Sequence, residues 1–223
     1  MQRPRAFAFD LDGTLVDSRR DIAAACNHVL VQAGREPLEL PVIVGFVGDG
    51  VRQLLARAFA LPPDDAILDA LVEELVRYYA AHPVVYTTWM PGALATLDAV
   101  ADAPLALLTN KARDVTIAVL DALGARDRFA FVYAGGDGPL KPDPWPVTAT
   151  ARALGIPADS LWVVGDGAQD IQAARAAGAT AVAVLGGFTP EARLRAAGPD
   201  ALVASLSDLA GLRERAMAGR PVA

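Results

Sequence analysis

Two aspartates directly follow a short apolar run near the start of the chain. Residues 6–9 are expected to form a buried strand, and Asp10 and Asp12 come at its end, just before Gly13. Alternate residues of an extended segment point to the same side, so both carboxylates can reach one ligand, while Gly13 permits a tight turn. Because ligands of α/β proteins bind at the carboxyl ends of parallel strands, this pair predicts a site for chemistry.

Three later polar segments also come at or just after expected strands. Each alone has an ordinary explanation: a strand-end Asp can cap a helix, a Thr-Asn pair can form a turn, and a lysine between prolines can be solvated. Their common position at one sheet edge favours a shared site instead. The segments are Thr109-Asn110-Lys111, Lys141 within residues 138–144, and Gly165-Asp166 followed by Asp170.

The acidic residues of these segments predict a divalent cation. Like charges held close together raise one another's pKa values, so a cluster of Asp10, Asp12 and Asp166 is unfavourable without a cation. Mg²⁺ relieves the repulsion, because it prefers oxygen ligands and suits carboxylates together with a substrate phosphate. Zinc is not indicated, because His28 and His82 are far apart in the sequence and both lie outside these segments.

The same residue types suit phosphoryl transfer. An aspartate such as Asp10 can attack phosphorus to form an aspartyl-phosphate, and Asp12 can give a proton to the leaving oxygen and later take one from water. The Thr109 hydroxyl, with backbone donors of the two residues that follow it, can bind phosphoryl oxygens. Lys141 brings a positive charge that balances the nucleophile and the transferring group.

The elements that must position these residues predict an α/β fold. Strand and helix patterns alternate, which indicates a Rossmann-like, doubly wound parallel sheet with helices on both faces. Residues 201–203 can add an edge strand before a C-terminal helix near residues 206–215. The expected strands are residues 6–9, 105–109, 131–133, 162–165 and 181–185, and the helices between the later strands are residues 112–123, 144–154 and 168–177.

A long insertion interrupts this alternation after the first strand. Residues 17–88 contain no convincing strand, and a connection of this length is not an ordinary loop. We interpret residues 17–88 as an inserted all-helical cap over Asp10 and Asp12, and residues 1–16 with 89–223 as the core. Pro91 marks the return to the core and is expected to start a helix. The expected cap helices are near residues 19–32, 50–59 and 64–81.

Composition and charge argue against nucleic-acid and membrane partners. The net charge of −6 argues against a nucleic-acid surface, which needs clustered Lys and Arg. No apolar run is long enough to span a membrane, and Asp10 comes too early for a signal peptide, so a cytoplasmic protein is expected. The single cysteine, Cys26, is expected to be a core residue rather than a nucleophile. A monomer and a homodimer both remain open.

Through the four polar motifs, which occur in order, the chain closely resembles the aspartate-nucleophile phosphatases of the haloacid dehalogenase (HAD) superfamily. The motifs anchor nearly the whole chain. The resemblance implies a HAD-like core with a helical cap, Asp10 as nucleophile and Asp12 as general acid/base. It also implies phosphate binding by Thr109 and Lys141, and a magnesium site of Asp166, the Asp10 side chain and the Asp12 carbonyl oxygen, supported by Asp170. Gly13, Asn110 and Lys111 are further candidates for phosphate binding.

Within this branch the chain looks most similar to phosphoglycolate phosphatases. The similarity lies in Val47-Gly48-Asp49-Gly50-Val51 of the cap and in Ala134-Gly135-Gly136-Asp137 after a core strand. Phosphatases acting on other substrates share these patterns. The expected partner is therefore a small phosphorylated metabolite, and a sugar phosphate, a nucleotide or an amino-sugar-acid phosphate such as N-acetylmuramic acid 6-phosphate stays open beside phosphoglycolate.

Three segments depart from the family pattern. Gly167 stands where a Ser or Thr commonly follows the metal-binding aspartate, which removes a hydroxyl but no required ligand. Residues 186–189, Gly-Gly-Phe-Thr, replace a more usual Gly-Tyr-rich loop and are expected to alter the substrate rim. The segment before Lys141 lacks basic residues, which leaves few positive charges for a substrate that carries an extra carboxylate.

The same residues also bear on other activities of the superfamily. A carbon–halogen dehalogenase lacks the leaving-group acid, so Asp12 argues against it. A phosphomutase shares the motifs but must exclude water from the intermediate, which the sequence does not test. A non-catalytic phosphate-binding module is disfavoured because every catalytic residue type is retained.

Two cap arginines are candidates for substrate recognition. Arg52 and Arg57 come shortly after the turn at residues 48–50, which should face the catalytic cleft. One function would be to bind a substrate carboxylate or phosphate. The alternative, which we favour for each residue alone, is a solvated arginine on a helix surface.

Overall fold

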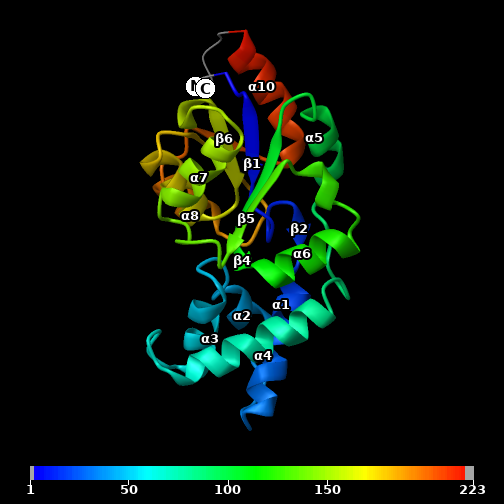
Figure 1. Cartoon of the computed structure of the whole chain (residues 1–223), viewed down its shortest axis with the longest axis vertical. Helices are drawn as coiled ribbons and strands as arrows, with labels where there is room; N and C mark the ends of the chain where they lie inside the picture. The colour runs from blue at the N-terminus through cyan, green and yellow to red at the C-terminus, as the bar shows by residue number, and fades with distance from the viewer. Residues whose placement is uncertain (1–2, 219–223) are drawn as a thin grey trace.

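The computed structural model describes residues 3–218 of the chain. Its centre is a parallel six-stranded sheet in the order β5-β4-β1-β6-β7-β8 (Figure 1). From β1 the chain builds outward through β4 and β5 on one side and through β6, β7 and β8 on the other, which confirms the doubly wound α/β fold. The strands are β1 (Ala6–Phe9), β4 (Leu105–Ala112), β5 (Phe131–Gly135), β6 (Leu161–Gly165), β7 (Thr180–Val184) and β8 (Ala201–Val203).

Apolar strand residues point to both faces of the sheet, and helices cover both faces. The residues are large on one face and mostly smaller on the other. Phe7, Phe9 and Trp162 lie in a cluster with residues of α5 (Ala93–Ala99), α6 (Arg113–Ala122) and α10 (Leu209–Met217). The alternate positions are mostly small, such as Ala6 and Ala8, and pack against α7 (Trp145–Ala153), α8 (Ala168–Ala176) and α9 (Glu191–Ala196). Period-two alternation thus buries both faces, as a parallel sheet requires.

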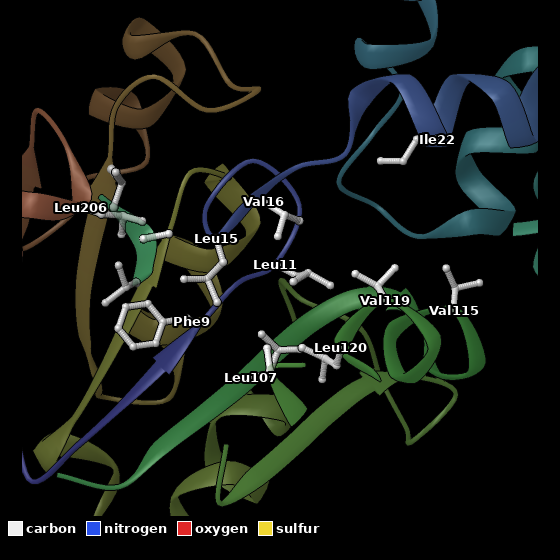
Figure 2. Packing of buried hydrophobic residues seen from close by; sticks show 14 of the residues in the cluster. Phe9, Leu11, Leu15, Val16, Ile22, Leu107, Val115, Val119, Leu120 and Leu206 are labelled. Atoms are coloured by element: carbon white, nitrogen blue, oxygen red, sulfur yellow. The ribbon is translucent and has the colours of Figure 1, made fainter. Parts of the chain in front are cut away.

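The four helices that follow β1 within the insertion, α1 to α4, form a group at one end of the sheet (Figure 1). α1 contacts each of the other three, and α4 also packs on α6 of the core. The apolar cluster continues into this group: Figure 2 shows Leu11, Leu15 and Val16 after β1, with Ile22 on α1 beyond them. The helices are α1 (Arg19–Gln32), α2 (Leu40–Val44), α3 (Val51–Phe59) and α4 (Ile67–Ala81).

Two short strands at the base of the insertion were not expected. β2 (Val16–Asp17) and β3 (Thr88–Trp89) pair antiparallel where the chain leaves and re-enters the core. Each has two residues, too few to show a period-two pattern. The helix α2 was also not expected. Its Pro41 lies in the first turn, where proline is tolerated although it breaks a helix at later positions.

A few element ends differ from expectation. Met90 and Pro91 precede Gly92, which has a positive φ of 78° and caps α5, so the helix starts at Ala93 rather than at Pro91. The expected C-terminal helix is divided into η3 (Leu206–Asp208) and α10. Two further 3₁₀ turns are η1 (Arg126–Arg128) and η2 (Ala158–Ser160). Within residues 3–218, none of the helices has the length and apolar character needed to cross a membrane.

Candidate active site

The loops after β1 and β6 and the carboxyl end of β4 meet beneath the inserted helices and line one cavity. These strands are neighbours in the sheet, so their carboxyl ends bring together motifs that are distant in the sequence. Gly48 and Gly50 of the insertion border the same cavity, so the turn does face the cleft. The core contributes Asp10, Asp12, Thr109, Asn110, Lys111, Asp166, Gln169, Phe188 and Thr189, and the insertion contributes Ile22, Val47, Val51, Leu54, Leu75 and Tyr79.

A buried lysine lies between two carboxylates at the base of the site. Lys141 Nζ is 3.0 Å from Asp10 Oδ1 and 2.5 Å from Asp170 Oδ1, and it also donates to the Leu108 carbonyl. Burial alone would lower the pKa of Lys141, but the charges of Asp10 and Asp170 raise it above its ordinary value. The lysine therefore remains charged, and its position relative to Asp10 agrees with charge balance at a nucleophile.

The carboxylate of Asp166 is held by a hydroxyl and a backbone amide. Thr14 Oγ1 donates to Asp166 Oδ1 at 2.7 Å, and the Phe188 N–H donates to Asp166 Oδ2 at 2.7 Å. Gly13 passes so close that a Cβ on it would lie 2.4 Å from Asp166 Oδ2. The turn after β1 thus needs glycine for space as well as for its positive φ of 87°. The loop at residues 186–189 orients this acid through its backbone.

Three of the acids fit a divalent cation. One carboxylate oxygen each from Asp10, Asp166 and Asp170 lies within 4.8 Å of the others. Burial, followed by the charge of Asp170, raises the pKa of Asp10 to about 7, and burial with the charge of Asp10 raises the pKa of Asp166 to about 6. One lysine does not balance this buried charge, whereas a hard cation with oxygen ligands does. The Asp12 carboxylate lies outside this cluster.

Asp12 is turned toward different partners. Ser18 Oγ donates to Asp12 Oδ1 at 2.5 Å, and Lys111 Nζ donates to Oδ1 and Oδ2 at 3.0 and 3.2 Å. Two aspartates that lie two residues apart after β1 thus have different surroundings: Asp10 faces Lys141 and the other acids, and Asp12 faces Ser18 and Lys111. That separation suits a nucleophile and a proton-transfer group with different tasks.

The carboxyl end of β4 combines a binding surface with a structural link. Thr109 is buried, lines the cavity, and accepts a hydrogen bond from the Lys111 N–H through its hydroxyl. The Asn110 amide group donates to the Gly48 and Lys141 carbonyls and accepts from the Lys141 N–H. The Asn110 side chain therefore joins the insertion to the Lys141 loop. Its predicted binding of phosphate would then come from the backbone N–H and not from the side chain.

Arg52 and Arg57 are not brought to the cavity. Arg52 contacts Asp69 and donates to the Pro63 carbonyl, and the Arg57 guanidinium binds Asp49 and the Phe46 carbonyl. Neither lines the cavity, whose wall from the insertion is mainly apolar. These contacts correspond to the surface-arginine alternative, and recognition of substrate by either residue stays a prediction. Among the described residues, Lys111 is the one cationic side chain that lines the cavity.

Four residues at the site were not singled out from the sequence as participants. Thr14 and Phe188 lie inside motifs that were noticed, but the direction of their hydrogen bonds depends on how loops from different strands meet. Ser18 precedes a helix, where a serine is an ordinary residue. Tyr79 lies on the apolar side of α4, and helical periodicity predicts its burial but not a partner for its hydroxyl.

Fold and site together define a Rossmann-like α/β protein with a buried acidic site at its switch point, covered by an inserted helical group. The chain belongs to the haloacid dehalogenase-like hydrolase family, whose model matches residues 7–184. It is 37% identical over 213 residues to a phosphoglycolate phosphatase of Chromobacterium violaceum, covering 92% of this chain and 94% of that one. A phosphoglycolate phosphatase of Aquifex aeolicus is 34% identical, over 94% of this chain and 97% of its own.

Solved structures show the same architecture. A structure from Haemophilus somnus, described as a predicted phosphoglycolate phosphatase, superimposes with a TM-score of 0.86 at 25% identity. The match covers 95% of this chain and 99% of that one. The inserted helices are therefore part of the shared architecture and not an addition peculiar to this chain.

Proposed function

We propose that this protein is a Mg²⁺-dependent phosphatase that hydrolyses a small phosphomonoester through an aspartyl-phosphate. The observation that carries the proposal is the arrangement around Asp10. Its carboxylate is beside Lys141, adjoins an acidic cluster that suits a cation, and lines the same cavity as Thr109 and Asp12. This combination supplies a nucleophile, charge balance and a proton-transfer group at one point.

The residues divide the reaction into two halves. In the first, an Asp10 carboxylate oxygen attacks phosphorus, the bond to the leaving oxygen breaks, and Asp12 gives that oxygen a proton. In the second, Asp12 takes a proton from the water that attacks the aspartyl-phosphate, which releases inorganic phosphate and restores Asp10. Thr109 and Lys141 bind the phosphoryl oxygens throughout. A magnesium ion held by Asp10, Asp166 and the Asp12 carbonyl, with support from Asp170, would stabilise the negative charge of the phosphoryl group.

The substrate is proposed from the relatives. Several relatives at 30–38% identity bear the name phosphoglycolate phosphatase, which makes 2-phosphoglycolate the first candidate. A sugar phosphate, an amino-sugar-acid phosphate and a nucleotide are the alternatives, and a phosphomutase is a more distant one. We also propose that residues 17–88 act as a cap, since their helices enclose the cavity and would limit the size of the leaving group.

A direct assay tests the reaction class. Purified protein should hydrolyse p-nitrophenyl phosphate in the presence of Mg²⁺, lose this activity in excess EDTA, and regain it when Mg²⁺ is restored. Asp10→Asn should abolish turnover, because an amide does not attack phosphorus as a carboxylate does. Full activity in EDTA would contradict the proposal. A phosphate-release screen with 2-phosphoglycolate, sugar phosphates, amino-sugar-acid phosphates and nucleotides then ranks the substrates.

A further inference from the structure

The general acid/base of the proposed reaction is linked to the cap by a lysine and a tyrosine. Lys111 Nζ is 3.0 and 3.2 Å from the two carboxylate oxygens of Asp12 and 3.0 Å from the Tyr79 hydroxyl oxygen. Lys111 belongs to the carboxyl end of the core strand β4, whereas Tyr79 lies near the end of the cap helix α4. A core catalytic group is thus connected to the cap through two side chains.

This link is buried, and its three acceptor oxygens account for the three N–H donors of the Lys111 ammonium. Only 6% of the Lys111 side chain is exposed, and Tyr79 is 3% exposed. An ammonium group has three N–H donors, and the two Asp12 oxygens with the Tyr79 oxygen account for three acceptors. The ammonium also lies 4.2 Å from the centre of the Tyr79 ring, so the aromatic face and the hydroxyl both fix its position.

We propose that Tyr79 is a positioning residue for the proton-transfer step, acting through Lys111 on Asp12. The inference rests on the proposed phosphatase function and adds a cap residue to it. With the hydroxyl in place, the ammonium is held against Asp12, and the carboxylate keeps one orientation toward the leaving group. Without it, one N–H of Lys111 has no partner, the ammonium can turn toward the phosphoryl group, and Asp12 loses a fixed contact. The acid/base is therefore fully oriented only when α4 lies against the core.

The neighbouring tyrosine on the same helix has no such connection. The Tyr78 ring stacks on His28 and His82, with ring centres 3.9 and 4.5 Å away, and Tyr78 does not line the cavity. Tyr78→Phe therefore removes a phenol hydroxyl from α4 without touching Lys111. It is a matched control for Tyr79→Phe, which keeps the buried ring and removes only the oxygen that binds the ammonium.

The test compares leaving groups. An alkyl oxygen needs a proton as it departs, whereas p-nitrophenolate leaves without one, so a misplaced acid should slow only the alkyl substrates. The quantity to compare is kcat/KM, which reports the steps up to release of the leaving group, for 2-phosphoglycolate, glycerol 1-phosphate and p-nitrophenyl phosphate. For Tyr79→Phe we expect a decrease of about tenfold on both alkyl phosphates and less than about twofold on p-nitrophenyl phosphate. Lys111→Met should show the same pattern, and Tyr78→Phe should match the wild type.

Each other result overturns the inference. Because the ratio of two kcat/KM values does not depend on how much protein is folded, equal losses on all three substrates indicate a purely structural role for Tyr79. A loss confined to 2-phosphoglycolate shows that the lysine and tyrosine bind the substrate carboxylate instead. Unchanged values show that the hydroxyl is dispensable. The proposed function fails separately, if the wild-type protein hydrolyses none of the three substrates with Mg²⁺.

Discussion

Lys141 Nζ lies 3.0 Å from Asp10 Oδ1, and both side chains are almost completely buried. Loss of this cation leaves the buried carboxylates of Asp10 and Asp170 without their shared partner, which is costlier than removing a surface charge. Lys141→Met should lower kcat by at least about 100-fold and the free energy of unfolding by about 3 kcal/mol. Urea unfolding and initial-rate assays measure the two effects.

A second substitution isolates the charge contribution to stability. Lys141→Met combined with Asp170→Asn removes the cation together with one of the two anions it holds. If uncompensated charge causes the instability, the double variant should be more stable than Lys141→Met alone. Additive losses of stability would show that packing, rather than charge, explains the effect of the single substitution.

Gly13 should be essential for the cation site. An alanine Cβ there would contact Asp166 at 2.4 Å, so the acid must move away from Asp10 and Asp170. Gly13→Ala is therefore expected to abolish both turnover and the increase in Tm that Mg²⁺ produces. Gly34→Ala is the control, because Gly34 also has a positive φ, of 72°, but has no atom within 4 Å of the added Cβ. It should cost about 1 kcal/mol of stability and retain the response to Mg²⁺.

The sequence was sufficient to predict which residues share the site, but not which neighbouring residues hold their side chains in place. Asp10, Thr109, Lys141 and Asp166 could be assigned to one site because each lies at or after the carboxyl end of an expected strand, and parallel strands share one active edge. The same rule predicted a core with helices on both faces. Local patterns carried this information, since apolar runs and polar strand ends are features of contiguous residues.

The contacts between loops depend on three-dimensional placement. Arg52 and Arg57 were considered for the cleft because they follow its turn, yet the helix α3 directs them to Asp69 and Asp49. Likewise, no periodicity shows that the Tyr79 hydroxyl meets Lys111, because the two residues come from different layers of the molecule. Such pairs become visible only after the cap is placed on the core.

Mg²⁺ should stabilise the protein more at alkaline than at acidic pH. Burial and the charge of Asp170 raise the pKa of Asp10 from 3.8 to about 7 in the folded chain without a cation. The folded state then binds this proton more tightly than the unfolded state, so the stability contributed by protonated Asp10 is present below about pH 4 and lost as pH rises through about 7. Cation binding requires the ionised acid and has the opposite dependence.

Thermal unfolding with and without Mg²⁺ measures this difference. The increase in Tm should be large near pH 8 and small near pH 5, where protons occupy Asp10 and Asp166. In Asp10→Asn the increase should be reduced at both pH values, because one ligand is absent. A Tm response to Mg²⁺ that is equal at the two pH values would show that the ion binds elsewhere on the protein.

Asp21 should be the main polar support of the cap's return to the core. This buried carboxylate on α1 accepts hydrogen bonds from the N–H groups of Val85, Tyr86 and Thr87 and from the Thr87 hydroxyl, at 2.6–3.2 Å. An amide offers one acceptor oxygen and points two donors at the same N–H groups, so Asp21→Asn should lower the free energy of unfolding by about 3 kcal/mol. Asp17→Asn is the control: its partner Arg19 is at the surface, and the change should stay below about 1 kcal/mol. Because β3 follows Thr87 directly, loosening this segment should also release the cap, and Asp21→Asn should raise KM in addition to lowering Tm. A KM that stays constant while stability falls would show that this segment stabilises the fold without controlling the position of the cap.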